Sequence, residues 1–251
     1  MISSFFHIIL YKPIFNIFVL LYNLLPGHDV GIVILLITLL LRLILYPLTS
    51  SSIKAQRSLQ ELQPKLEAIK KQYADDKVKQ AQAMQELYKT HKINPLTSCL
   101  PMLIQLPILI ALYWVLRDGL ASTNLAQNLY SFVSNPGTIN PISLKLFDMG
   151  KASIVLAVFA AAAQFWQAKS LSRKSPPKEA GEGAKDEDMA TMMNKQMLYL
   201  MPFMTLIIGM RLPAGLTLYW FLSTLLMAIQ QVMLGRNSTP DSKIIEGEIV
   251  K

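Results

Sequence analysis

The sequence predicts an all-α membrane protein, built as a five-transmembrane-helix bundle with a cytoplasmic helical hairpin and an N-terminal interfacial helix. Three observations predict this fold class. Hydrophobic residues make up 52% of the 251 residues, and the mean hydropathy is +0.36. Long apolar runs recur along the chain, and a run of about 20 residues is enough to cross a bilayer as a helix. Lysine and arginine gather in the segments between these runs.

The N-terminal segment, residues 1–28, is predicted to be an amphipathic helix that lies on the outer leaflet. Residues 5–25 form an apolar run of 21 residues, but Lys12, Asn16 and Asn23 fall on one narrow stripe of it. Such a stripe is typical of a helix in the membrane interface. A sixth span or an uncleaved signal anchor is the alternative for this segment.

The core is predicted over residues 29–234, and its first span is the 19-residue apolar run Val30 to Leu48, which contains Arg42. An arginine at a helix centre costs about 3 kcal/mol on insertion scales, whereas each Leu, Ile or Val contributes roughly −0.3 to −0.6 kcal/mol. The run holds 14 such residues, so it still spans. The charge is expected to face protein or water rather than lipid.

Polar side chains share a helix face with Arg42. Thr38, Tyr46 and Thr49 stand four residues before it and four and seven residues after it, so one side of this span is polar. Ionisable residues inside a membrane are candidates for a functional site. The alternative is an arginine near a helix end, whose side chain snorkels to the lipid headgroups.

A cytoplasmic helical hairpin is predicted over residues 50–93, with its tip at residues 74–77. Apolar side chains repeat there at alternating spacings of three and four residues, which indicates helices that pack on each other: Leu59, Leu62, Leu66, Ile69 and Tyr73 in the first arm. The hairpin is either a solvated helix pair without a specific ligand or a docking site for a ribosome or targeting factor.

Four further apolar runs are predicted as the remaining spans, at residues 100–116, 152–168, 197–210 and 212–234. The run at 197–210 is short for a span. Between them, residues 170–191 are predicted as a flexible cytoplasmic loop, because their charged, Gly- and Pro-rich composition buries too little apolar surface to order itself. Residues 235–251 are predicted as a disordered cytoplasmic tail for the same reason.

Polar residues also occur inside the later spans. Gln105 lies between two prolines of the second span, Gln164 follows a face of small residues in the third, and Trp220 shares a face with two threonines in the fifth. Helix kinks, close helix packing and an interfacial aromatic belt are the structural alternatives for these three features. Arg42, Gln164 and Trp220 together suggest that several helices contribute to one hydrated, positively charged concavity.

The distribution of positive charge predicts the orientation. Residues 50–92 carry nine Lys and Arg, residues 169–195 carry six and the tail after residue 234 carries three, against five on the opposite side. Short loops rich in these residues stay in the cytoplasm, so the N-terminus is predicted outside and the C-terminus inside. The net charge of +8 reflects this topology, or also an attraction to anionic lipid or ribosomal RNA.

Several function classes find no support in the sequence. No GxxxxGK[ST], GxGxxG or HExxH motif is present, and the three histidines lie outside the five predicted spans, which carry no Asp or Glu at their centres. The single Cys99 cannot form an intramolecular disulfide. We therefore expect a protein that is not an enzyme and that uses no cofactor or metal. A transporter or channel with Arg42 as an anion-binding charge is an alternative, although no internal repeat is visible.

Four stretches resemble the YidC/Oxa/Alb family of membrane protein insertases: Arg42 within LLRLILYPLT, residues 62–65 (LQPK), residues 94–113 (NPLTSCLPMLIQLPILIALY) and residues 213–220 (PAGLTLYW). The resemblance runs from about residue 29 to residue 234. It differs from the usual family pattern at Ser98, where glycine is common, and at Thr224, where asparagine is common.

The resemblance implies five core helices around a groove that is open to the cytoplasm and to lipid and closed outside. It implies that Arg42 is the charge of the groove and that a small set of further residues lines the substrate path, namely Thr38, Leu106, Leu109, Gln164 and Trp220. It also implies a short bacterial form without the large outer domain of some members.

The function implied by the resemblance is insertion of nascent transmembrane segments from the cytoplasm into the bilayer, through a hydrophilic, positively charged groove and without nucleotide hydrolysis. The expected partners are nascent membrane proteins and the lipid bilayer, with no small-molecule substrate. A ribosome and a Sec translocon are further partners that the sequence leaves open. The expected location is the bacterial plasma (inner) membrane.

Overall fold

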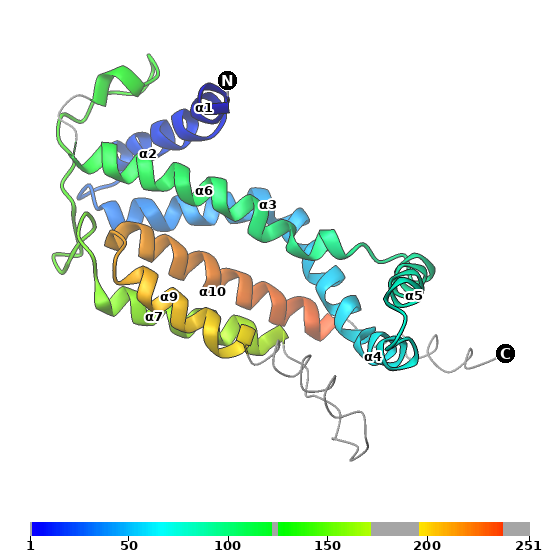
Figure 1. The fold of residues 1–251 in the computed structure, drawn as a ribbon. Helices are drawn as coiled ribbons and strands as arrows, with labels where there is room; N and C mark the ends of the chain where they lie inside the picture. The colour runs from blue at the N-terminus through cyan, green and yellow to red at the C-terminus, as the bar shows by residue number, and fades with distance from the viewer. Residues whose placement is uncertain (1, 122–124, 172–195, 238–251) are drawn as a thin grey trace.

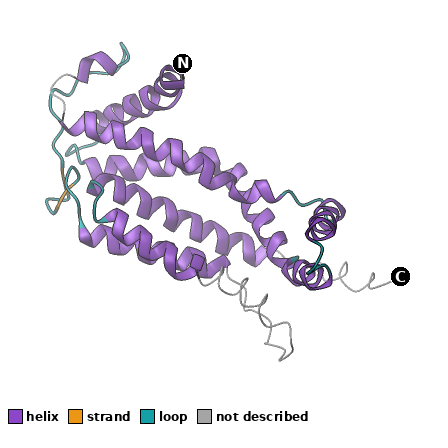
Figure 2. Ribbon diagram, in the orientation of Figure 1, coloured by secondary structure: helices purple, strands orange, loops and turns teal. Residues whose placement is uncertain are grey.

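The computed structural model describes residues 2–121, 125–171 and 196–237, and these are mostly helical (Figures 1 and 2), so the prediction of an all-α membrane protein is confirmed. Two short strands, β1 (Ile142–Ser143) and β2 (Phe147–Asp148), pair antiparallel. The helices are α1 (Ile2–Phe6), a π-helical turn (His7–Tyr11), α2 (Lys12–Leu24), α3 (Val30–Glu61), α4 (Gln63–Gln72), α5 (Lys77–Thr90), α6 (Pro95–Ala121), a 3-10 turn (Leu125–Asn128), α7 (Ile154–Leu171), a second π-helical turn (Gln196–Leu200), α9 (Met201–Gly209) and α10 (Ala214–Asn237).

Four helical segments in the described part of the chain are long and apolar enough to cross a bilayer: Ser4–Leu24, Val30–Glu61, Leu100–Leu120 and Ala214–Gly235. The apolar stretches of α7 and α9, Ile154–Ser170 and Leu198–Gly209, are shorter. Three of the five predicted core spans thus reach full span length, as does the N-terminal segment. The number of spans stays a prediction.

The long helices form a bundle in which α6 packs on α3, α3 on α10, α10 on α7 and α7 on α9 (Figure 1). On α7 the small residues Ala157 and Ala160 are fully buried, and a Cβ at Gly209 of α9 would lie 3.1 Å from the Cβ of Ala157. Small side chains therefore let these helices approach closely. The main core contains buried side chains of α2, α3, α6 and α10, among them Phe15, Phe18, Val33, Ile34, Ala111, Val115 and Leu216.

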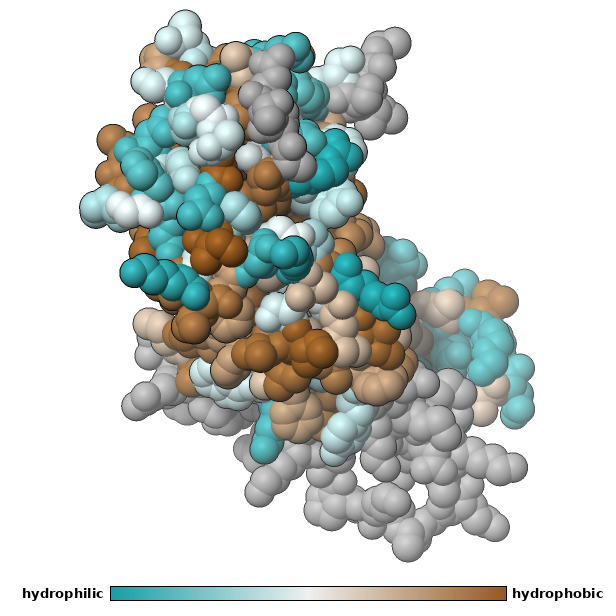
Figure 3. Space-filling model, turned by 90° about the vertical axis from the view of Figure 1, so that its left-hand side faces the viewer, coloured by the Kyte–Doolittle hydropathy of each residue, from teal (hydrophilic) through white to brown (hydrophobic). Residues whose placement is uncertain are grey.

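The loops that follow α6 and α9 and precede α7 and α10 gather at one end of the bundle, which we call the loop end (Figure 1). A view from this side shows hydrophilic residues beside hydrophobic ones (Figure 3). Backbone hydrogen bonds join the start of α10 to the loop that precedes α7, from Ala214 to Lys151 at 2.7 Å and from Gly215 to Met149 at 2.9 Å. The start of α10 is thereby fixed to the β1–β2 segment.

The polar stripe of the N-terminal segment faces protein at the loop end. The Asn16 side chain donates to the carbonyl of Asn128 at 2.9 Å and accepts from the backbone N–H of Tyr130 at 2.6 Å. The Asn23 side chain donates to the carbonyl of Ser134 at 2.7 Å. These asparagines therefore fasten α2 to the loop after α6. The interfacial position of residues 1–28 stays a prediction.

The opposite end of the bundle carries the pair α4 and α5, which we call the hairpin end (Figure 1). The turn between these helices covers residues 73–76, close to the predicted tip. Helix α3 continues without a break to Glu61, so the first part of the predicted hairpin belongs to the same helix as the first span, and the hairpin boundary at residue 50 stays a prediction. Ile53 explains the extension, since it is fully buried and keeps this part of α3 packed in the bundle. The loop predicted at residues 170–191 and the tail predicted at 235–251 lie almost entirely outside the described residues.

Candidate functional site

Arg42 is half-buried in the bundle, on α3, and its side chain reaches α10. Its Nε and Nη2 atoms donate to the hydroxyl oxygen of Ser223, at 3.1 and 2.5 Å. Within the described ranges, no carboxylate lies within salt-bridge distance of the guanidinium. The positive charge therefore has a neutral hydrogen-bond partner and is not compensated by a fixed negative charge.

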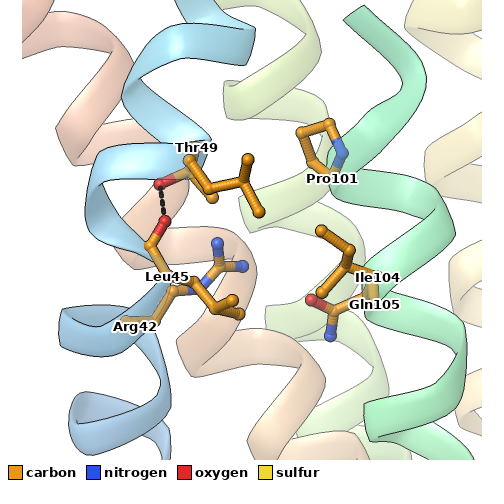
Figure 4. Close-up of a pocket in the computed structure, with 7 residues that line it drawn as sticks. Arg42, Leu45, Thr49, Pro101, Ile104 and Gln105 are labelled. Atoms are coloured by element: carbon orange, nitrogen blue, oxygen red, sulfur yellow. Dashed lines mark hydrogen bonds between the residues drawn. The ribbon is translucent and has the colours of Figure 1, made fainter. Parts of the chain in front are cut away.

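A small pocket lies beside Arg42, between α3 and α6 (Figure 4). Its cavity volume is about 10 Å³, which is room for about one water molecule. Arg42 and Gln105 line it from opposite helices. The full lining is Arg42, Leu45, Leu48 and Thr49 from α3 and Pro101, Ile104 and Gln105 from α6. One charged and two polar side chains thus meet apolar ones in a narrow space.

A second set of hydrogen bonds connects the pocket to α10. The Gln105 side-chain amide donates to the hydroxyl of Tyr219 at 2.9 Å, and Tyr219 stands one helical turn before Ser223. The Thr49 hydroxyl lies 3.1 Å from the side-chain oxygen of Gln230, further along α10. Helices α3, α6 and α10 therefore all contribute polar groups around Arg42.

The other predicted site residues on α3 and α6 lie outside this pocket lining. Thr38 is fully buried, and its hydroxyl donates to the carbonyl of Ile34 at 2.6 Å within the same helix. On α6, Leu106 is exposed and Leu109 is half-buried. Their roles along a substrate path stay predictions.

The predicted residues of α7 and α10, Gln164 and Trp220, are both half-buried. One turn from Gln164, the side-chain nitrogen of Gln167 lies 2.9 Å from the sulfur of Met227, so α7 does present polar groups towards α10. Neither Gln164 nor Trp220 lines the pocket beside Arg42. A single concavity that unites them with Arg42 stays a prediction.

Two residues of this site, Tyr219 and Ser223, were not predicted from the sequence, and a third, Gln105, was predicted without a role in it. Tyr219 and Ser223 are spaced by four residues, which places them on one face of α10. A glutamine inside an apolar span needs a polar partner. The signal that could have found the site was therefore the pairing of this glutamine with a polar stripe on another span.

Apolar helices of span length, packed around an arginine that has no acidic partner among the described residues, define a multi-pass α-helical membrane protein with a polar site in its interior. The comparisons with known proteins identify the family. Residues 20–241 match the model of the family described as 60Kd inner membrane protein, and the chain belongs to that family. The predicted resemblance is thus confirmed, and the chain is a multi-pass protein of the bacterial inner membrane.

Several curated relatives carry the name membrane protein insertase YidC. That of Fusobacterium nucleatum is 37% identical over 204 residues, which cover 81% of this chain and 85% of that protein. That of Methylobacillus flagellatus is 32% identical over 211 residues, 84% of this chain and 33% of the relative. That of Neisseria gonorrhoeae is 32% identical over 241 residues, 95% of this chain and 38% of the relative. The chain therefore spans most of the first relative and between a third and two fifths of the other two.

Proposed function

We propose that this protein inserts nascent transmembrane segments into the bacterial inner membrane from the cytoplasmic side, without nucleotide hydrolysis. The observation that carries the proposal is the position of Arg42, a partly desolvated cation whose hydrogen-bond partner is a serine. The names of the relatives support the same function. An insertase of this kind is not an enzyme, since no covalent bond of the client changes.

The electrostatics of Arg42 suit a transient polar ligand. Two opposite charges about 4 Å apart attract by about 4 kcal/mol at an effective dielectric constant of 20, against about 1 kcal/mol in water. Desolvation of the incoming carboxylate offsets part of that gain. The guanidinium loses its hydration when the protein folds, so its desolvation free energy does not add to the barrier for insertion. An acidic residue in the polar tail of a client is therefore the group that Arg42 attracts most strongly.

The client must separate α3 from α6, because the resting pocket has room for about one water molecule. Helix α6 is suited to such a movement. Pro101, which lines the pocket, and Pro107 lack the N–H that would bond to the preceding turn, so this wall has fewer internal hydrogen bonds than an ordinary helix. Next to the pocket, α6 exposes Leu103, Leu106 and Ile110. This apolar surface is where the hydrophobic part of the client passes to lipid.

The orientation proposed for the chain places the hairpin end in the cytoplasm and the loop end outside. The charge distribution supports it, because the hairpin and the segment between α7 and α9 carry most of the lysines and arginines. In this orientation, Arg42 is approached from the hairpin end. The nascent chain and the bilayer are the partners, and docking of a ribosome on the hairpin stays a prediction.

Replacement of Arg42 tests this function directly. Purified Arg42→Ala protein in liposomes is compared with wild type for insertion of two clients that differ only in an acidic or a neutral outer tail. Insertion of the acidic client is expected to fall about tenfold, the equivalent of about 1.4 kcal/mol, and insertion of the neutral client by much less. Arg42→Lys keeps the charge and should keep part of the activity.

The matched control is Arg211→Ala, which removes an exposed arginine at the loop end and should leave both clients unaffected. Equal insertion of the acidic client by Arg42→Ala and wild type would refute the role of the charge. Ion flux through the same liposomes tests the alternative of a channel or transporter. If the protein is an insertase, the flux should not exceed that of empty liposomes.

A further inference from the structure

The halves of α3 and α10 nearest the hairpin end meet along a line of polar residues, which we call the polar seam. It lies on the hairpin side of Arg42 and Ser223 and shares only Thr49 with the lining of the pocket between α3 and α6. Thr49, Ser50 and Arg57 of α3 hydrogen-bond across it to Gln230 and Gln231 of α10, and the buried Ser52 lies on the same half of α3. Polar side chains at a contact between two membrane helices are costly unless they bond to each other.

One glutamine of the seam is fully paired. The side-chain nitrogen of Gln230 donates to the Ser50 hydroxyl at 2.8 Å and to the carbonyl of Tyr46 at 3.3 Å. Its side-chain oxygen lies 3.1 Å from the hydroxyl of Thr49. Gln230 therefore stabilises the contact between α3 and α10 in the way expected of a polar residue between helices.

The adjacent glutamine differs. Gln231 is 1% exposed and Ser52 is fully buried. Within the part of the chain that the structure describes, neither polar atom of the Gln231 side chain has a hydrogen-bond partner, and the Ser52 hydroxyl has none either. Buried groups of this kind lack a protein partner in the closed contact, which makes that contact less stable. An unpaired polar group in a native protein calls for a functional explanation.

We propose that Gln231 and Ser52 form a second binding site for the client, which receives the backbone of its extended polar segment when α3 and α10 part at the hairpin end. The inference rests on the proposed insertase function and deepens it. A carboxamide both donates and accepts hydrogen bonds, as a peptide group does. Gln231 can therefore pair with any polar sequence through its main chain, whereas Arg42 selects charge.

The positions of the two sites support a shared path. Ser223, the partner of Arg42, and Gln231 are eight residues apart on α10, which is about 12 Å along a helix. An extended chain covers that distance with about four residues. A short polar tail can thus contact Gln231 and Arg42 at the same time, and a client that arrives from the hairpin end meets Gln231 first.

Arg57 holds the seam closed at its outer edge. Its guanidinium donates to the backbone carbonyl of Gln231 and occupies the space above Gly235, where a Cβ would clash with it. This contact joins the far ends of α3 and α10. Its release is the step that lets the two helices separate and exposes the side chains of Ser52 and Gln231.

A matched pair of substitutions tests the proposal, namely Gln231→Met and Gln230→Met. Both remove a carboxamide of similar size from neighbouring positions. Gln231→Met is expected to keep or raise the melting temperature, because it removes unpaired groups, while insertion of a client with a polar tail falls three- to tenfold. Gln230→Met is expected to lower the melting temperature, because it removes the three hydrogen bonds of this side chain to Ser50, Tyr46 and Thr49. The proposal is overturned by wild-type insertion in Gln231→Met, or by a fall in its melting temperature equal to that of Gln230→Met.

Disulfide capture gives a second measurement that does not depend on the stability of a glutamine variant. The single native cysteine is replaced (Cys99→Ser), and Gln231→Cys or Ile104→Cys is introduced to react with a cysteine in the polar tail of a stalled nascent chain. Capture by both positions supports the second site. Capture at Ile104 alone, with insertion intact, overturns this inference and leaves the proposed function standing. Loss of capture at both positions together with loss of insertion by wild type overturns the proposed function itself.

A water-soluble maleimide separates client binding from simple hydration of the seam. Labelling of Gln231→Cys without any disulfide to the client tail would show a seam that holds water only, and would overturn the proposal. Ile37→Cys is the control for burial, because Ile37 is 2% exposed in the apolar core and is expected to stay unlabelled. Capture of the tail at Gln231→Cys, together with an unlabelled Ile37→Cys, is the expected result.

Discussion

The two ends of the bundle differ in how completely their polar side chains are paired. At the loop end, the Asp29 carboxylate accepts from the backbone N–H groups of Gly31 and Leu144, at 2.8 and 2.6 Å, and from the hydroxyl of Ser143. At the hairpin end, the side chain of Gln231 is buried without a partner in the described part of the chain. Satisfied networks make a structure rigid, and unsatisfied groups favour rearrangement. The comparison indicates a bundle that is closed at one end and able to open at the other.

This difference matches the direction of the proposed insertion. A client that enters from the hairpin end must not pass through to the outside, so the loop end has to stay shut while the other end changes. Asp29 caps the first turn of α3 and fastens the strand β1 to it, and the asparagines of α2 fasten the loop after α6. Every long-range side-chain contact of this kind adds to the cost of opening the loop end.

The largest effect on stability is expected for Asp29→Ala. The substitution removes a helix cap and the acceptor of several hydrogen bonds, and should lower the free energy of unfolding by about 2 kcal/mol. For a protein of this size, that corresponds to a fall in melting temperature of about 4–8 °C. Circular dichroism of the protein in detergent measures it.

The control for the lost charge is Asp75→Ala, because Asp75 is exposed in the turn between α4 and α5. Its melting temperature should stay near that of the wild type. An Asp29→Ala protein that melts like Asp75→Ala would mean that the loop end is not held by this carboxylate, and the contrast between the two ends would be lost.

A smaller effect is expected for Ser223→Ala, which removes the hydrogen-bond partner of Arg42 and keeps its charge. Stability should fall by about 1 kcal/mol, as for an ordinary hydrogen bond. Insertion of a client with an acidic tail should stay within about twofold of wild type, because attraction to a carboxylate depends on the guanidinium. Parallel melting and insertion assays measure both. A loss of insertion as large as that of Arg42→Ala would show that the serine, and not the charge, receives the client.

Much of the fold could be predicted from the sequence, because apolar runs and charge distribution reflect the lipid environment directly. The long apolar runs predicted the spans in α3, α6 and α10. The face of small residues on α7 packs closely against other helices, as such a face predicts. The continuation of α3 beyond its apolar run could not be predicted, because residues 50–61 are mostly polar in sequence and the packing of this part of the helix depends on tertiary contacts such as that of the buried Ile53. The stripe of Asn16 and Asn23 was found, but a pattern in one helix does not say which partner it faces.

The site was less predictable than the fold. Arg42 is conspicuous in the sequence because of its cost in lipid, whereas Ser223 and Tyr219 are ordinary residues whose role depends on the distance between two helices. The contrast between Gln230 and Gln231 is an extreme case. The two residues are identical and adjacent, but neighbouring side chains of a helix point about 100° apart and therefore have different surroundings. No property of a single segment distinguishes them.

The smallest effect, and the sharpest test of the loop end, concerns pH. Burial raises the pKa of Asp29, but its hydrogen bonds from Ser143, Leu144, Ile32 and Gly31 lower it more, so the pKa of the folded protein lies below the ordinary value of 3.8. The carboxylate therefore stabilises the fold fully above about pH 4 and loses that contribution as the pH falls through the lowered pKa. The expected result is a constant difference in melting temperature between wild type and Asp29→Asn from pH 7 to 5, which then shrinks towards pH 3. Other acidic groups titrate in both proteins, so their effects cancel in this difference. A difference in melting temperature that stays constant down to pH 3 would show that the negative charge of Asp29 does not contribute to the stability of the fold.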